Sequence, residues 1–355
     1  EQEALIRLNR VVNPDLLYIN ESVVVVEQAE GGIPAGVVHS ARAGQGWLAL
    51  AASLNQNPWT LAQTNQFAHP GLLTPGGSVL VPGGDSATKA LPFPLRDLQV
   101  KPLPPEQGRT VSIHLVTARP LTVTGALGDW PLHFNPESEN SQYALLGIDR
   151  LADPNLYRLT IAAADASGRT FKFSQPLPVR EGGYALDPPL TVDPATIDPA
   201  VTGPESEQIK AAVAPFTPTR HWNGVFALPS VGLLRSMFGS LRSYNGGPYD
   251  SFHSGVDFSG AEDRPVTAPA PGVVVFTSAL TVRGNATLID HGWGVYTGYW
   301  HQSSILVKAG DRVEAGQIIG YQGATGRVTG PHLHWEIWVG GFQVDPLQWT
   351  TEGFP

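Results

Sequence analysis

The chain has 355 residues, a formal net charge of −9, no cysteine, and Gly and Pro at 39 and 32 positions. This length predicts two or three domains, and the Gly and Pro content predicts a turn-rich, multidomain and mainly β fold. The acidic charge argues against binding to nucleic acid or to an anionic membrane, because both need a basic face. No apolar run reaches the roughly eighteen residues of a membrane span. Without thiolates, a metal site must be built from His and carboxylate groups.

Two N-terminal segments share one order of apolar runs and turns. Residues 36–84 carry a helix-like run from Trp47 to Leu54, a second helix-like run that closes at Asn65, a Pro-Gly turn and a Val-rich strand. Residues 1–30 carry only the second half of this order. The pattern resembles the LysM peptidoglycan-binding module, so we expect a LysM-like βααβ module at 36–84 and a partial LysM-like repeat at 1–30. The resemblance implies binding to glycan; the alternative is a small unit that serves as a spacer.

The Pro-rich stretch 92–105 predicts a linker or an irregular first strand. Five runs of alternating apolar residues follow, separated by turn residues: 111–116, 121–125, 143–148, 157–161 and 170–173. This period-two pattern predicts an antiparallel β-sandwich over residues 98–200. His114 and His133 have no carboxylate neighbours at ligand spacing. We therefore expect this domain to act as a spacer.

A helical connector is predicted at residues 202–215. Thr202 is placed as a helix N-cap, with Glu205 three residues later, and Pro215 marks the end of the helix. The connector leads into the last predicted domain, residues 216–355.

Two pairs of residues in this last domain suggest metal chemistry. His332 and His334 lie one residue apart in a run rich in Trp, Ile and Leu, so a strand would direct both imidazoles to one face. His253 and Asp257 are four residues apart, and Gly255 and a β-branched neighbour favour a strand there too. A straight strand would separate their Cα atoms by about 13 Å, so convergence on one metal needs a bend, which Gly255 permits.

A zinc site follows from these residue types. His253, Asp257 and one of the two later histidines would supply two nitrogens and one oxygen, leaving a fourth position open for water. Such an open site is catalytic rather than structural. The remaining histidine and His301 are then available for acid and base work.

The C-terminal motifs resemble the LytM/lysostaphin-type zinc endopeptidases of the bacterial cell wall. The resemblance covers about 230–350 and rests on His253-x-x-x-Asp257, Tyr299-Trp-His301 and Gly330-Pro-His332-Leu-His334-Trp-Glu336. It implies an antiparallel β LytM-type peptidase domain that holds one zinc ion per chain. The implied zinc ligands are His253, Asp257 and His334. His301 and His332 are the implied catalytic pair, and Tyr244 or Tyr249 the implied substrate-binding donor to the developing oxyanion.

Other polar residues of this domain receive different expectations. His291 lies in a predicted turn, where the family has His-Gly as a structural feature, and we assign it no catalytic role. Asp345 is expected to pin the terminal segment rather than to bind metal. His221 and Asn223 precede the ligand motifs, and no spacing argument places them in the site.

The sequence therefore predicts a zinc-dependent endopeptidase that hydrolyses peptide bonds in peptidoglycan, in the stem peptide or the cross-bridge. The alternatives are a latent or inactive wall-binding protein that activates other wall hydrolases, a scaffold stiffened by its metal, and a peptidase with no wall substrate. We expect a secreted protein of the cell envelope or the extracellular space. Because the first repeat is interrupted at Glu1, we also expect that residue 1 is not the natural N-terminus and that any signal peptide lies outside this sequence.

Overall fold

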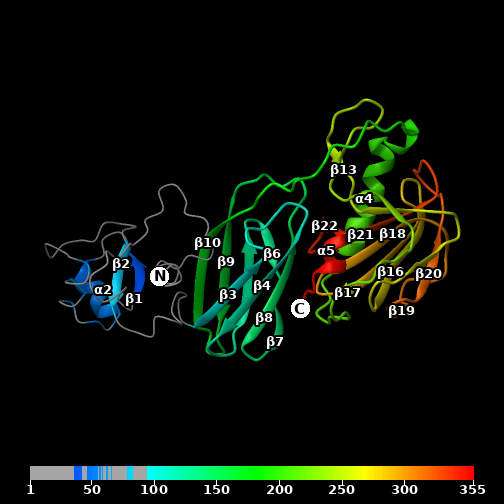
Figure 1. Ribbon diagram of the computed structural model, residues 1–355. Coiled ribbons are helices and arrows are strands. Elements are labelled where there is room, and N and C mark those ends of the chain that lie inside the picture. The colour runs from blue at the N-terminus through cyan, green and yellow to red at the C-terminus, as the bar shows by residue number, and fades with distance from the viewer. Residues whose placement is uncertain are drawn as a thin grey trace.

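The computed structural model describes residues 36–41, 46–54, 56, 58, 61–62, 65, 78–82 and 94–355 (Figure 1). The partial repeat predicted at residues 1–30 lies outside them. In the N-terminal part, β1 (Gly36–Ser40) pairs antiparallel with β2 (Ser78–Pro82). The helix α2 (Trp47–Ser53) shares a small core with β2. It is the one helix with defined bounds among the described residues of this part, so the predicted βααβ repeats are not shown.

Two four-stranded antiparallel sheets follow. The first has the order β3 (Leu95–Lys101), β4 (Thr110–Thr117), β8 (Ser141–Gly147) and β7 (Asn135–Ser138). The second has the order β10 (Thr170–Pro178), β9 (Leu156–Ala164), β5 (Thr122–Leu127) and β6 (Trp130–Leu132).

Their inner faces share one core, in which Ile113 and Leu115 of β4 join Leu159 and Ile161 of β9. The five alternating runs seen in the sequence all fall on these strands. The Pro-rich stretch contains the edge strand β3, whose register against β4 shifts between Leu95 and Asp97, in keeping with the predicted irregular first strand; its prolines flank the strand rather than interrupt it.

A helix links the sandwich to the last sheet. After the short 3₁₀ helix η1 (Pro194–Thr196), α4 spans Pro199–Val213. The predicted cap at Thr202 is wrong, because the carboxylate of Asp198 accepts from the backbone N–H of Ala200 at 2.8 Å and starts the helix earlier. Proline at the first helical position reinforces that start.

The helix does more than connect, since its buried side chains pack on the last sheet. Ile209 and Val213 share a cluster with the apolar residues Ala286, Leu288, Tyr296, Trp300 and Trp338. Figure 1 shows α4 lying across the strands β18 and β21.

The C-terminal part is a ten-stranded antiparallel sheet. Its main path is β11 (Leu233–Ser236), β14 (Val256–Ser259), β21 (His332–Val339), β18 (Val295–Ile305), β17 (Gly284–Gly292), β16 (Gly272–Leu280) and β19 (Arg312–Val313). Off this path, β22 (Phe342–Val344) pairs with β21, and β20 (Ile318–Gln322) pairs with β18 and with β15 (Pro265–Thr267). A separate two-stranded ribbon joins β12 (Leu241–Arg242) to β13 (Ser251–Phe252).

The strand β21 has two different faces. Leu333, Trp335, Ile337 and Val339 are buried in the main core of this part. The alternate positions, from His332 to Trp338, carry polar and aromatic side chains on the face that α4 covers. The histidine motif of β21 therefore lies on the face of the sheet that α4 covers.

The last helix, α5 (Pro346–Thr351), joins this sheet to the sandwich. The side-chain amide of Gln348 donates to the carbonyl of Thr110 at 3.1 Å and accepts from its N–H at 2.8 Å. The indole of Trp349 donates to the Thr110 hydroxyl at 2.8 Å. Asp345 caps α5 and pairs with Arg109, in keeping with its predicted structural role. Within the described ranges, no helix combines the length and apolar character needed to cross a membrane.

Candidate metal centre and catalytic cleft

The register between β14 and β21 brings three of the predicted residues to one place. Asp257 lies directly opposite His334, and Ser259 lies opposite His332. Because directly paired residues of an antiparallel ladder share a face, the Asp257 carboxylate and both imidazoles stand on the same side of the sheet. The predicted strand placement of the His-x-His pair is confirmed.

His253 lies in the short non-strand segment that connects β13 to β14, and from there its side chain reaches this face. A Cβ atom on Gly255 would lie 2.2 Å from the carbonyl oxygen of Trp335 and 2.8 Å from Nε2 of His334. Only glycine lets the backbone pass so close to β21. The bend predicted at Gly255 is therefore present, and it carries His253 over the strand.

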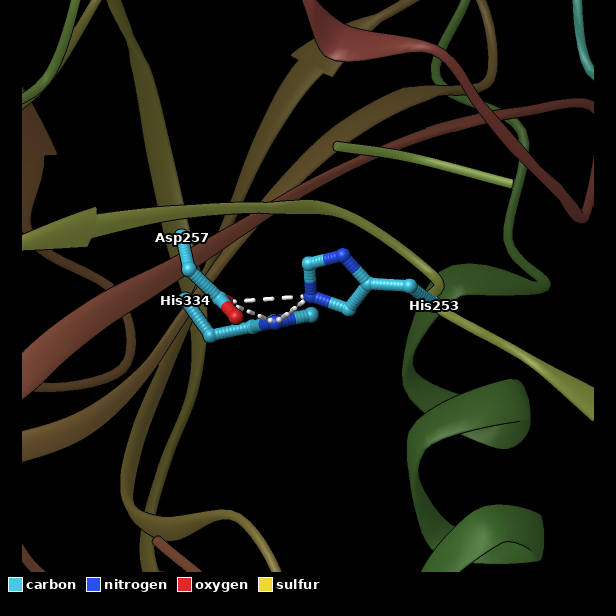
Figure 2. Close-up of side chains that lie close together, drawn as sticks. All are labelled: His253, Asp257 and His334. Atoms are coloured by element: carbon cyan, nitrogen blue, oxygen red, sulfur yellow. Dashed lines mark hydrogen bonds and ion pairs between the residues drawn. The ribbon is translucent and has the colours of Figure 1, made fainter. Parts of the chain in front are cut away.

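Three side-chain atoms converge at this point (Figure 2). His253 Nε2 lies 3.0 Å from Asp257 Oδ1 and 2.9 Å from His334 Nδ1, and the latter two atoms are 2.8 Å apart. His253 and His334 are buried, with 1% and 7% of their surface exposed. Among the described residues, this is the group of His and acidic side chains whose ligand atoms lie close enough to hold a metal ion.

Neighbouring groups fix which nitrogen of each imidazole carries the proton. Nδ1 of His253 lies 2.8 Å from the carbonyl oxygen of Met237, so it must donate there. Nε2 of His334 lies 3.2 Å from the carboxylate of Glu336 and donates to it. The opposite nitrogens therefore direct lone pairs toward Asp257 and toward each other, an arrangement that a cation satisfies and that hydrogen bonds alone do not.

The carboxylates of the centre are held as anions. Burial raises the pKa of Asp257, but the His253 and His334 imidazoles that face it outweigh this effect, and the pKa lies well below its usual range. Burial also raises the pKa of Glu336, but its contact with His334 outweighs burial and lowers this pKa to about 2. Two imidazoles and one carboxylate form the donor set of a catalytic zinc site, so the residues present fit this metal.

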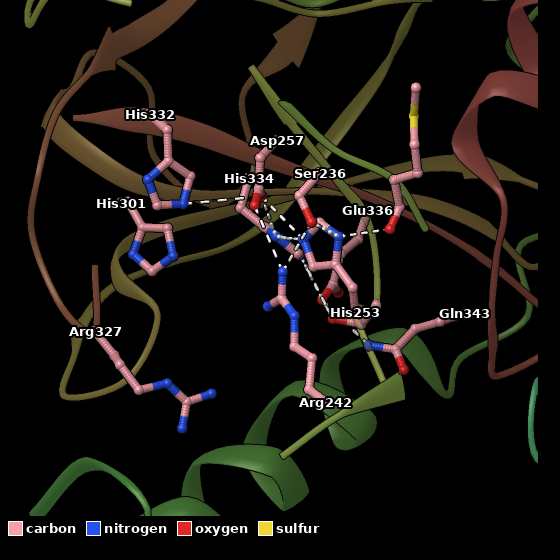
Figure 3. Close-up of polar contacts among 12 residues, drawn as sticks. Ser236, Arg242, His253, Asp257, His301, Arg327, His332, His334, Glu336 and Gln343 are labelled. Carbon is pink, nitrogen blue, oxygen red and sulfur yellow. Dashed lines mark hydrogen bonds and ion pairs between the residues drawn. The ribbon is translucent and has the colours of Figure 1, made fainter. Parts of the chain in front are cut away.

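His301 and His332 stand beside this centre, and Nε2 of His332 lies 3.8 Å from Oδ1 of Asp257 (Figure 3). Their ring centroids are 4.8 Å apart, and the His301 centroid is 6.3 Å from that of His334. Nδ1 of His301 donates to the Thr325 carbonyl at 2.8 Å, and Nδ1 of His332 to the Gly330 carbonyl at 2.9 Å. In the neutral form of each ring, Nε2 therefore keeps a lone pair for the cleft.

His301 is aimed by an irregularity in β18. Its neighbour Trp300 pairs with His334, so strict alternation would place His301 on the opposite face. A register shift against β17 and a φ of 63° at His301 break this alternation. A left-handed backbone at a residue other than glycine is strained, and such strain is typical of functional positions. Burial, with His332 and His334 nearby, lowers the pKa of His301 to about 3.

These side chains line a cleft of about 600 Å³. One wall comes from outside the sheet, with Asp187, Leu190 and Val192 of the segment before α4 and with Thr202 and Ser206 of α4 itself. Tyr244 lines the cleft, but Tyr249 does not, and its hydroxyl donates to the Asp187 carbonyl at 2.9 Å.

Three polar residues of the domain lie away from the cleft. His291 is fully buried between the Pro271 carbonyl and Thr297. The backbone of His221 donates to the carbonyl of His291, and Asn223 lines a different hollow beside the sandwich.

Sequence reasoning missed several polar residues of the site. Glu336 could have been found, because it stands two residues after His334 and so on the same face of a strand. Arg242 could not, since its ion pair with Asp187 at 3.1 Å joins residues far apart in the chain. The carbonyl of Met237, which orients His253, leaves no signal in the sequence at all.

Comparison with known proteins matches this region of the chain to a family model. Residues 251–346 match the family model described as Peptidase family M23. The C-terminal part of the chain carries an M23 peptidase domain. This domain is 47% identical over 96 residues to the peptidoglycan DD-endopeptidase ShyA of Vibrio cholerae, covering 27% of this chain and 22% of that protein. It is 42% identical over 95 residues to the DD-carboxypeptidase/endopeptidase Mpg of Neisseria meningitidis, again covering 27% and 22%. The chain thus matches about a fifth of the length of these relatives.

A solved structure resembles more of the chain. The putative peptidase M23 of Pseudomonas aeruginosa superposes with a TM-score of 0.50 at 26% identity, covering 66% of this chain and 88% of that one. The likeness extends beyond the M23 domain, because the matched share of the chain is more than twice the share that the family model covers. The resemblance to LytM-type peptidases predicted from the sequence is confirmed for the M23 domain.

Proposed function

We propose that this protein is a zinc-dependent endopeptidase that hydrolyses peptide bonds in bacterial peptidoglycan. The proposal rests on one observation. Three ligand atoms from His253, Asp257 and His334 converge within 3.0 Å of one another, in a cleft that two further imidazoles also line. The name of the relative ShyA, a peptidoglycan DD-endopeptidase, supports peptidoglycan as the substrate, and the name of Mpg also describes an endopeptidase.

His253, Asp257 and His334 would hold the zinc ion, with a fourth position open toward the cleft. A zinc ion so bound supplies a Lewis acid that polarises the scissile carbonyl and lowers the pKa of a water molecule. Glu336, Met237 and the strand register keep the three ligands in place before the ion arrives. Preorganisation of this kind avoids the cost of ordering the ligands when metal binds.

His301 and His332 would move the proton. In each imidazole a backbone carbonyl accepts from Nδ1–H, and Nε2 faces the cleft. One Nε2 can accept a proton from the attacking water, and the resulting imidazolium can deliver it to the leaving amine. A proton taken up from solvent would let Nε2 of the other imidazole donate to the tetrahedral oxygen. Tyr244, which lines the same cleft, is placed to supply a further hydroxyl donor, and Tyr249 is the weaker candidate because its hydroxyl is engaged with Asp187.

The N-terminal part of the chain would bind the peptidase domain to the cell wall. The antiparallel unit of β1, α2 and β2 supports a LysM-like module at 36–84, in which Asn65 bonds to both backbone groups of Leu80. We further propose that the sandwich spaces this module from the peptidase domain at 216–355. A location in the cell envelope or outside the cell follows from the substrate.

A latent form of the enzyme is the second candidate, and one observation favours it. The segment 187–192 and α4 form one wall of the cleft, so part of the chain before the M23 domain lies beside the metal centre. If that wall must move before a cross-linked peptide can enter, the protein would bind to the wall without cutting it, or act as an activator of other hydrolases.

The test uses the intact chain. Purified cross-linked peptidoglycan is incubated with the zinc-loaded protein, and the released muropeptides are identified by mass spectrometry. We expect new free amino termini with zinc, none after chelation, and none with His332→Ala, which should still bind zinc and fold. The matched control is His114→Gln in the sandwich, which should retain activity.

Three results would count against the proposal. Products that survive both chelation and His332→Ala would overturn it. Cleavage of an unfolded protein alone would indicate a different substrate. A folded, zinc-bound protein without products would favour the latent form.

A further inference from the structure

The arginine side chains that surround the cleft of this acidic chain are unevenly paired. Arg242 pairs with Asp187 at 3.1 Å, and Arg283 pairs with Glu205 at 3.1 Å. Arg327 lines the same cleft, yet among the described residues no carboxylate lies within ion-pair distance of its guanidinium. Figure 3 shows Arg327 and Arg242 both below the histidine cluster.

The backbone of Arg327 is fixed on the loop that also orients the catalytic imidazoles. Its N–H donates to the Val282 carbonyl at 2.8 Å, and the carbonyl of Thr325, two residues earlier, accepts from His301. At the preceding Gly326, with a φ of 77°, a Cβ atom would lie 2.4 Å from the backbone nitrogen of Gly284. The loop is thus held against β17, and His332 follows five positions after Arg327.

The guanidinium of Arg327 makes only part of the contacts available to it. One Nη donates to the Thr196 carbonyl at 3.0 Å, the other approaches the Tyr244 hydroxyl at 3.5 Å, and the group lies 4.6 Å from the centre of the Tyr244 ring. A guanidinium has five N–H donors, so further donors remain. Neither a neutral carbonyl nor a phenol neutralises its charge.

A partly buried charge without a counter-ion is costly and implies a ligand that supplies one. Burial is the largest cause that lowers the pKa of Arg327, and the neighbouring Arg242 and Arg283 act in the same direction, while Glu205 and Tyr244 oppose them. Arg235, the fourth arginine that lines the cleft, is exposed to solvent and contacts the Ser259 hydroxyl, so among the described residues Arg327 is the half-buried arginine of the cleft without a carboxylate partner. An anion that approached the cleft would find Arg242 and Arg283 paired, Arg235 in solvent, and the Arg327 guanidinium available inside.

We propose that Arg327 binds a carboxylate of the substrate peptide beside the reacting bond, so that the cleft selects peptides that carry a free acid there. This inference rests on the proposed function. A fork of parallel N–H donors matches a carboxylate, and hydrogen bonds between charged groups are roughly twice as strong as neutral ones. The Tyr244 ring beneath the guanidinium holds it in position.

The experiment compares a cross-linked muropeptide dimer with two derivatives. One carries an amide in place of the terminal carboxylate, and the other carries an amide in place of the side-chain carboxylate nearest the cross-link. We expect the wild type to prefer the free acid over one of these amides by about tenfold or more in kcat/KM. The amide that loses activity identifies the source of the carboxylate. Arg327→Gln should bring this ratio close to one, and Arg327→Lys should restore part of it.

The control is Arg312→Gln, an exposed arginine on β19 away from the cleft, which should keep the preference. A merely structural role for Arg327 would lower kcat/KM equally for acid and amide and leave the ratio unchanged. That outcome, or equal rates for all three dimers, would overturn the inference.

A binding measurement separates this inference from the proposed function. Calorimetry with zinc-loaded His332→Ala, with and without Arg327→Gln, measures affinity for the same three dimers in the absence of turnover. If Arg327→Gln lowers the affinity for the free-acid dimer but not for the corresponding amide, the result supports the subsite even if the wild type cleaves nothing. Equal affinities overturn the subsite even if cleavage is observed.

Discussion

The carboxylate of Glu336 connects the metal centre to the buried side of the domain. It is 1% exposed and accepts from Ser254, Gln343, Trp338 and Nε2 of His334. Replacing it with an amide removes the negative charge that fixes the tautomer of His334. We expect Glu336→Gln to weaken zinc binding by about 10- to 100-fold, the usual effect of losing an orienting partner. Competition with a chromophoric chelator measures this, with the exposed Glu314→Gln as control; an affinity within twofold of the wild type would contradict the prediction.

His291, which plays no part in the cleft, makes stability depend on pH. Burial lowers its pKa to about 4 from the ordinary value of 6.5, so the folded state keeps it neutral where the unfolded chain takes up a proton. Stability is therefore complete above pH 6.5 and falls as the pH drops toward 4, by up to about 3 kcal/mol. Urea unfolding of the metal-free protein at both ends of this range measures the loss. The free energy of unfolding of His291→Gln should fall less on acidification than that of the wild type. An equal fall would show that His291 is not the source of the pH dependence.

At the level of single residues, regular strands make the site predictable and irregular backbone does not. The alternation in 332–339 is enough to place His332 and His334 on one face, and the same rule includes Glu336. The sequence alone offers His301 only as a histidine left over from the metal site, and its pairing with His332 comes from the family resemblance. Its orientation depends on a register shift and a left-handed backbone, which no local pattern of side chains specifies.

Among the elements, α4 is tied to the sheet by one buried carboxylate. Glu205 accepts from the backbone N–H groups of Val282 and Arg283 and from the Arg283 guanidinium. Glu205→Ala would leave these donors without a partner in a buried place, and we expect a loss of about 2–4 kcal/mol in the free energy of unfolding. Chemical denaturation measures the loss. Glu207→Ala is the control on the same helix, because its pair with Lys210 is exposed and contributes little. Equal effects of the two substitutions would show that Glu205 does not anchor the helix.

The position of α4 shows the limit of sequence patterns for elements. Thr202 and Glu205 have the spacing of a capping box, and this spacing predicts a start about one turn too late. Asp198 followed by proline makes an equally good start, and it also leaves Glu205 free to bind the turn after β16. A tertiary partner in the distant segment 282–283 decides between two local signals of similar strength.

For the whole molecule, α5 couples the M23 domain to the sandwich through buried groups. Gln348 is 1% exposed and satisfies both backbone groups of Thr110. Gln348→Ala leaves them unpaired, so we expect a loss of about 2–3 kcal/mol and a separation of thermal unfolding into two steps. Scanning calorimetry detects both effects, and the exposed Thr351→Ala serves as control. A single unchanged transition in Gln348→Ala would mean that the two domains are joined by other contacts.

The sequence predicts the order of domains better than their contacts. The sandwich and the peptidase sheet follow from alternating runs and from motifs, which are local. The contacts between them join Arg109 and Thr110 to α5, more than two hundred residues later in the chain. Such pairs leave no periodic signal, and neither does the approach of Asp187 to Arg242 across the cleft.

The packing of α4 on the sheet has a practical consequence for anyone who wishes to excise the peptidase. A fragment cut just before Phe216 would keep every predicted ligand and both catalytic histidines. It would also expose to water the apolar side chains that α4 covers, among them Tyr296, Trp300 and Trp338. Contiguous apolar surface of this kind promotes aggregation. A soluble fragment should therefore begin before Asp198, and the helix belongs to the smallest piece of this chain that can be handled as an enzyme.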